Sequence, residues 1–209
     1  MDTIIDPPSI PGPDELRAHM GSISVLAANK MLVRLDTHCR RFIELSPFLV
    51  LATSDADGRL DASPRGDPPG FVRVLDDATL LLPDRRGNNL VDSFRNLLTN
   101  PGVGMIFFVP GVEETLRVNG RAEITTDAAL LAPSEMQGKA PTTGTLIHIQ
   151  EAYFHCAKAL KRARLWDPAT RIERSAFPSL GRILADQQSR PDGEKLEADV
   201  ETAYRERMY

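Results

Sequence analysis

Segments with the apolar patterns of β-strands occupy the middle of the chain. They cover residues 48–53, 59–63, 71–75, 79–82, 103–109, 115–125 and 145–150. Most are four to eight residues long and are bounded by Gly, Pro or Asp, which is typical of short strands between turns. The Asp-Gly step at residues 57–58 predicts a tight hairpin. The pattern therefore predicts six or so short strands, joined mainly as antiparallel neighbours.

Apolar residues at helical spacing lie between and around these strands. Asp36 has the position of an N-cap, and Ser46-Pro47 would end the helix that it begins. Further helices are predicted at residues 27–35, 89–98, 127–136, 152–165 and about 194–207, with a short one starting at Pro13. A doubly wound sheet would need helices between nearly all strands, and no GxGxxG follows the first strand. The predicted class is mainly β (α+β): an antiparallel barrel with flanking helices.

Changes in composition along the chain divide it into three parts. Residues 1–35 begin with a proline-rich stretch and form an extended and helical lead-in. Residues 36–167 contain the strands and form the main domain. Residues 168–209 are charged and interrupted by prolines, which indicates an arm rather than a second domain.

Composition and charge narrow the classes of function. The chain has 209 residues and a net charge of −4, which disfavours a general nucleic-acid binder. No apolar run approaches the roughly 18 residues that a membrane span needs, and the acidic, proline-broken start does not resemble a secretory signal. The two cysteines lack CxxC spacing, so we expect a reduced, cytoplasmic protein without a disulfide framework. Neither His38-Cys39 nor His155-Cys156 predicts a metal site, because adjacent helical residues diverge by about 100° and one pair cannot supply two ligands. A cysteine nucleophile is not predicted either, because a buried Cys acts by default as a small hydrophobic residue.

A basic turn, Pro83-Asp84-Arg85-Arg86-Gly87-Asn88-Asn89, follows one strand and precedes a predicted helix. A phosphomonoester is bound by guanidinium forks, close backbone amides and helix N-termini, and the turn offers all three. A solvated surface turn is the alternative, because two arginines and a glycine are common on surfaces.

Two further segments carry polar groups in suggestive positions. In Ser63-Pro64-Arg65-Gly66-Asp67, proline and glycine predict an edge strand or bulge whose exposed amides would suit the polar edge of a flavin ring. The alternative is a turn held by an Arg65–Asp67 pair. Alternation over residues 113–120 places Thr115, Arg117 and Asn119 on one face, which either lines a ligand groove or faces solvent.

The end of the predicted domain contains a basic stretch and the only tryptophan. Lys158 and Arg162 share one helix face at i, i+4 spacing, and they either face solvent or approach an anion. Trp166 is either a core residue or an aromatic cover on a planar ring.

Taken together, residues 30–167 resemble the pyridoxamine 5′-phosphate oxidase-like proteins of the FMN-binding split-barrel superfamily, and in particular a bacterial subgroup of uncertain substrate. The resemblance rests on SPFLVLAT (46–53), SPRGDPPGF (63–71), LPDRRGN (82–88) and residues 100–101, 110–112, 114–121, 155–158 and 165–167.

The resemblance implies a homodimer of six-stranded split barrels with FMN in clefts at the subunit interface. It implies that the cofactor-binding residues are Arg65, Gly66, Asp67, Pro83, Asp84, Arg85, Arg86, Asn88, Thr115, Lys158 and Trp166, the last two reaching the other subunit's cofactor. No catalytic residue follows from it. The oxidase has Arg-Lys where this chain has Arg85-Arg86, and its substrate-phosphate residues have no counterpart here, so vitamin B6 oxidation is not implied. The expected function is an FMN-dependent oxidoreductase with a small-molecule donor or acceptor, or alternatively a non-catalytic flavin-binding or redox-sensing module.

Overall fold

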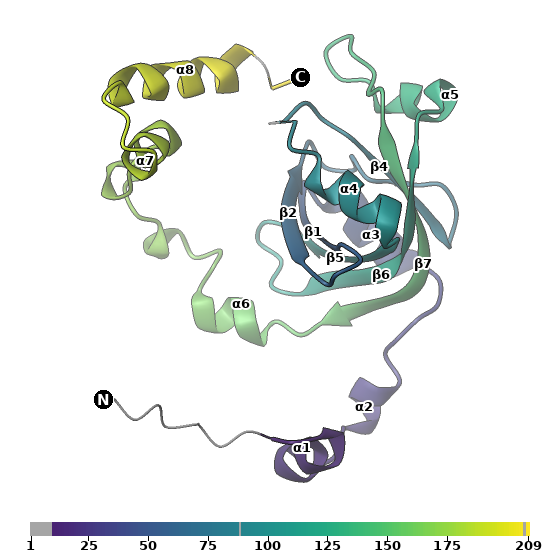
Figure 1. Cartoon of the computed structure of the whole chain (residues 1–209). Helices are drawn as coiled ribbons and strands as arrows, with labels where there is room; N and C mark the ends of the chain where they lie inside the picture. Colours follow the sequence, from purple (N-terminus) through teal and green to yellow (C-terminus); the bar gives the residue numbers. More distant parts are fainter. Residues whose placement is uncertain (1–9, 88, 207) are drawn as a thin grey trace, which may run out of the picture. The chain divides into compact units, whose positions relative to one another are not determined.

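The computed structural model describes residues 10–87, 89–206 and 208–209, and the chain divides into two compact units after Met31 (Figure 1). The first unit contains two helices, α1 (Pro13–Met20) and α2 (Val25–Ala28), neither of which has a buried residue. The second unit, Leu32–Tyr209, contains every strand of the described residues. The division into a lead-in, a domain and an arm at residues 35 and 167 stays a prediction.

The second unit is built on one antiparallel sheet in the order β2-β1-β5-β6-β7-β4-β3. Six strands have five or more residues: β1 (Phe48–Ser54), β2 (Leu60–Gly66), β4 (Thr79–Pro83), β5 (Gly102–Phe108), β6 (Thr115–Thr125) and β7 (Gly144–His155). The remaining strand, β3 (Arg73–Val74), has two residues. The predicted split barrel, mainly antiparallel with flanking helices, is confirmed.

The described residues of the second unit also form α-helices. They are α3 (Thr37–Leu45), α4 (Asp92–Thr99), α5 (Ala128–Leu131), α6 (Lys158–Ala163), α7 (Leu180–Gln187) and α8 (Gly193–Glu206). Helices α3 and α4 pack against the sheet, whereas α7 and α8 pack against each other (Figure 1). The predicted cap of α3 is confirmed, because the Asp36 carboxylate accepts a hydrogen bond from the Cys39 amide at 2.8 Å. No helix in the described part of the chain combines the length and apolar character that a bilayer crossing requires.

The core lies between the strands and the inner faces of α3 and α4. Its fully buried side chains include Ile43 of α3, Leu51 of β1, Phe107 of β5 and Leu116 of β6. This burial orients α4, which inserts Leu97 into the core.

Two amide side chains at the C-terminal end of α4 fix it to β1. Asn96 Nδ2 donates to Thr53 Oγ1 at 2.9 Å, and Asn100 Nδ2 donates to Ser54 Oγ at 2.7 Å. These contacts and the buried Leu97 fix the C-terminal half of α4 against the sheet. The N-terminus of the same helix therefore comes to lie beside β2.

The predicted helix over residues 152–165 is wrong in its first part. β7 continues to His155, and α6 begins only at Lys158. The reason is the length of β6, whose residues pair with β7 as far as Thr115 opposite His155. Backbone pairing along a long neighbouring strand outweighs local helix preference. The argument that placed His155 and Cys156 on a helix therefore does not hold.

Other helix boundaries also differ from the sequence pattern. The helices expected at residues 27–35 and 127–136 are reduced to α2 and to α5 with a following 3-10 turn, and α7 was not predicted. Helix α8 begins within one residue of its predicted start, and residue 207, where the prediction ended, lies outside the described residues.

Candidate functional site

A cavity of about 490 Å³ lies between β2, the turn after β4 and the first turn of α4. It is lined by residues 61–66, 83–87 and 89–94 together with Phe71. Its volume is within the roughly 300–1,000 Å³ range of small-molecule sites. Two segments that the sequence singled out, the SPRGD strand and the basic turn, thus meet at one cavity.

Arg65 is held inside this cavity by two partners. Its Nη1 donates to Asp84 Oδ1 at 3.2 Å, and its Nη2 donates to Ser93 Oγ at 3.1 Å. Ser93 in turn donates to Asp61 Oδ2 at 2.9 Å. The Arg65 Nε is buried and has no hydrogen-bond partner among the described residues. A buried donor without an acceptor costs roughly 1–3 kcal/mol, so this atom favours an incoming acceptor.

Burial also changes the acidity of the Asp84 carboxyl group. Burial raises the pKa of Asp84 above its usual value, although the nearby Arg65 guanidinium opposes the shift. Desolvation disfavours the charged form of a carboxylic acid, and the ion pair with Arg65 compensates for part of that cost.

Arg85 pairs with a different carboxylate. Its Nε donates to Asp67 Oδ2 at 2.5 Å, and the Asp67 side chain is only 1% exposed. The predicted alternative of an Arg65–Asp67 turn pair is therefore wrong: Arg65 pairs with Asp84, and Asp67 pairs with Arg85. Two crossed ion pairs join β2 to the basic turn and hold both sides of the cavity together.

Arg86 and the start of α4 form the least occupied part of the cavity. Arg86 is exposed, and it makes no ion pair with any residue that the structure describes. Helix α4 begins without a side-chain cap, because its N-cap residue is Val91 in the left-handed region at φ 55°. A guanidinium with no ion pair among the described residues and an uncapped helix N-terminus line the same cavity, and both groups are suited to binding an anion.

The remaining predicted site residues lie elsewhere in the structure. Thr115 is buried in β6, and Lys158 is exposed on α6. Trp166 is partly buried, and its Nε1 donates to the Val112 carbonyl at 2.8 Å. None of the three is among the residues that line the cavity, whereas Gly66 and Pro83 are. Asn88 lies outside the described residues.

Sequence reasoning missed three residues of the site. Asp61 and Ser93 join the network around Arg65, and Tyr209 donates through its hydroxyl to Asp67 at 2.6 Å. The position of Asp61 four residues before Arg65 on an alternating strand placed both on one face, which was a usable signal. Nothing in the local sequence connects Tyr209 to a residue 142 positions away.

Comparison with known proteins assigns the fold to a family. The model of the pyridoxamine 5′-phosphate oxidase family matches residues 35–156, which is more than half of the chain. The chain belongs to this family. No curated protein matches it significantly.

Several solved structures are similar to the chain. HupZ of Group A Streptococcus is 19% identical with a TM-score of 0.47, the match covering 57% of this chain and 93% of that one. An FMN-binding protein from Syntrophomonas wolfei is 11% identical with a TM-score of 0.44, covering 56% and 83%. A protein of the pyridoxinephosphate oxidase family from Clostridium acetobutylicum is 15% identical with a TM-score of 0.43, covering 56% and 85%.

Proposed function

We propose that this protein binds FMN in the cavity between β2 and α4 and acts as an oxidoreductase of the pyridoxamine 5′-phosphate oxidase type. The observation that carries the proposal is the meeting of Arg65, Arg85 and Arg86 with the uncapped start of α4 at one cavity. Membership of the family supports a flavin as the ligand. The substrate and the electron donor do not follow from these residues.

The phosphate would lie at the turn after β4. Arg86 supplies a positive charge that has no ion-pair partner in the described part of the chain. Gly87 has no described atom outside its immediate neighbours closer than 4.0 Å to an added Cβ, so the backbone there is open to a ligand. The first amides of α4 would donate to the same phosphate oxygens. Charge-assisted contacts of this kind are the strongest hydrogen bonds that a protein offers an anion.

The ring of the flavin would lie along β2. This strand is at the edge of the sheet and pairs only with β1 in the described topology, so one side of its backbone is available. Arg65, held by Asp84 and Ser93, would present its Nε, a donor without a partner among the described residues, on this side. Bound flavin would supply the electron transfer, and the side chains would orient the ring and exclude water.

An absorption spectrum of the purified protein tests the proposal. We expect a yellow protein, or a colourless one that becomes yellow on addition of FMN, whose flavin is bleached by a reductant and recovers with an acceptor. Protein that stays colourless after incubation with FMN would contradict the proposal. Tight FMN binding without multiple turnovers across electron donors would indicate the flavin-binding or redox-sensing alternative instead.

We also propose that the protein is a homodimer whose partner subunit completes the site. The supporting observation is that Lys158 and Trp166, which the family resemblance assigns to the cofactor, do not line the cavity of their own chain. If each cavity needs both subunits, loss of FMN on dilution should follow dissociation of the dimer. Light scattering with simultaneous detection of flavin absorbance measures both. A monomer that retains FMN would contradict the dimeric site.

A further inference from the structure

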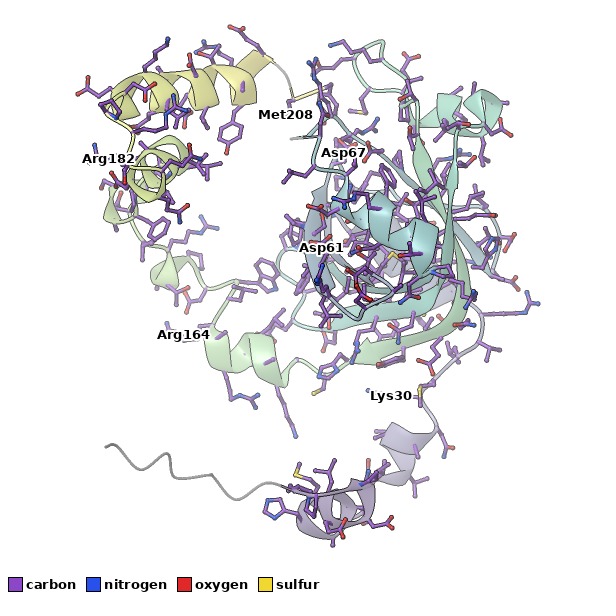
Figure 2. The ribbon with its side chains drawn as sticks, viewed as in Figure 1. Lys30, Asp61, Asp67, Arg164, Arg182 and Met208 are labelled. Carbon is purple, nitrogen blue, oxygen red and sulfur yellow. The ribbon has the colours of Figure 1, made fainter. Side chains whose placement is uncertain are left out.

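The segment after α8 contacts the basic turn through Tyr209. The Tyr209 hydroxyl donates to Asp67 Oδ1 at 2.6 Å, while Arg85 Nε donates to the other oxygen, Oδ2, at 2.5 Å. The Arg85 Cζ lies 5.7 Å from the centroid of the Tyr209 ring, within the range of a cation–π contact. Figure 2 labels Asp67 and Met208, the residue before Tyr209.

A second contact holds the same residue from another loop. Lys139 Nζ, in the loop before β7, donates to the Tyr209 carbonyl oxygen at 2.8 Å. Tyr209 is thus connected to the end of β2, to the turn after β4 and to the loop before β7. These three contacts distinguish Tyr209 from a surface residue that makes no specific contact with the rest of the unit.

The geometry shows on which side of Arg85 the tyrosine lies. Arg85 lines the cavity, but neither Asp67 nor Tyr209 is among the described residues that line it. The segment therefore does not fill the cavity as a plug. It contacts Arg85 from outside and acts on the cavity only through this side chain.

We propose that Tyr209 is a positioning residue for the phosphate subsite, which keeps the Arg85 guanidinium directed at the bound phosphate by holding the buried Asp67 carboxylate. The inference rests on the proposed function. With Tyr209 in place, each carboxylate oxygen of Asp67 has one donor, and the Nε bond leaves the terminal nitrogens of Arg85 for a ligand. Without the hydroxyl, Asp67 Oδ1 loses that donor, and the carboxylate turns toward the terminal nitrogens of Arg85, which then compete with phosphate.

The neutral state of Tyr209 suits this role. The hydrogen bond to Asp67 raises the pKa of the Tyr209 hydroxyl above its usual value. The charged groups in contact with Tyr209 are Asp67 at the hydroxyl, Arg85 at the ring and Lys139 at the main-chain carbonyl oxygen. The hydroxyl therefore remains a donor throughout the neutral range.

The test compares two ligands that differ only in the phosphate. Dissociation constants of FMN and riboflavin are measured by flavin fluorescence for wild type, Tyr209→Phe and Tyr204→Phe. Tyr204 is a half-exposed residue of α8 that receives the same chemical change. We expect Tyr209→Phe to weaken FMN about three- to tenfold, the effect of about one hydrogen bond, and to leave riboflavin unchanged. Tyr204→Phe should change neither constant.

The outcomes separate this inference from the proposed function. Equal weakening of FMN and riboflavin would show a merely structural role and overturn the inference. An unchanged FMN constant in Tyr209→Phe, with wild type still preferring FMN over riboflavin, would overturn the inference alone. Wild-type protein that binds FMN no better than riboflavin would overturn the phosphate subsite itself, and the inference with it.

Discussion

The buried ion pair between Asp67 and Arg85 gives the sharpest prediction about stability. The two side chains are 1% and 19% exposed, and their closest atoms are 2.5 Å apart. Replacing Arg85 by Ala leaves Asp67, whose side chain is 1% exposed, without its charged partner. Replacing Asp67 by Asn leaves the more exposed Arg85 guanidinium without its charged partner. The two substitutions therefore should not cost the same, although they remove the same contact.

The magnitudes follow from this difference in exposure. Removing one partner of a buried pair costs about 3–5 kcal/mol, and we expect about 3 for Arg85→Ala because Asp67 keeps the Tyr209 hydroxyl as a donor. Asp67→Asn should cost only about 1–2 kcal/mol. The double variant should cost less than the sum by at least about 1 kcal/mol, because no uncompensated charge then remains buried.

Urea unfolding of the ligand-free protein measures these free energies. Trp166, the only tryptophan, is a fluorescence reporter within the same unit. In thermal unfolding, a loss of about 3 kcal/mol corresponds to a midpoint lower by roughly 6–12 °C for a protein of this size. Additive costs in the double variant, or a larger cost for Asp67→Asn than for Arg85→Ala, would refute the reasoning from burial.

Four further predictions concern individual residues. Arg86→Ala should weaken FMN binding by at least about tenfold without changing the unfolding free energy, whereas exposed Arg95→Ala should change neither quantity. If Arg86→Ala and wild type bind FMN with the same dissociation constant, Arg86 does not belong to the phosphate subsite. At pH 8 a thiol reagent should modify exposed Cys156 but not buried Cys39 until the protein unfolds; modification of both in native protein would contradict the burial. Burial raises the pKa of the Cys39 thiol from 9.0 to about 12, above its unfolded value. The contribution of this thiol to stability is therefore complete below pH 9 and is lost as the pH rises toward 12. In Cys39→Ala, the free energy of unfolding should fall less steeply between pH 9 and 12 than in wild type. Gly120→Ala should cost about 1–3 kcal/mol or more, because the new Cβ meets a backbone carbonyl of β7 at the β6 bulge; an unchanged midpoint of unfolding would contradict that contact.

Local signals in the sequence were sufficient for much of the fold. The Asp36 cap, the Asp-Gly turn at residues 57–58 and the apolar runs of the strands act over a few residues, and all of them are found in the structure. Two strands differ in length from the prediction: β3 is reduced to Arg73–Val74, and β7 extends to His155. The helix expected from residue 152 failed because pairing with distant β6 decided the conformation of residues 152–155. Local preference has no information about such a partner.

The candidate site divides in the same way. Residue chemistry alone identified the SPRGD strand and the basic turn, because guanidinium groups, glycine and a following helix are a recognisable combination for an anion. Spacing in the sequence favoured the wrong pairs, because Arg65 lies two residues from Asp67, whereas the partners observed in the structure are 19 and 18 residues apart. Only the folded chain settled the pairs, by carrying Arg65 to Asp84 and Arg85 to Asp67. It also brought Tyr209 to Asp67, because contacts between distant segments depend on the packing of the whole sheet and not on sequence spacing.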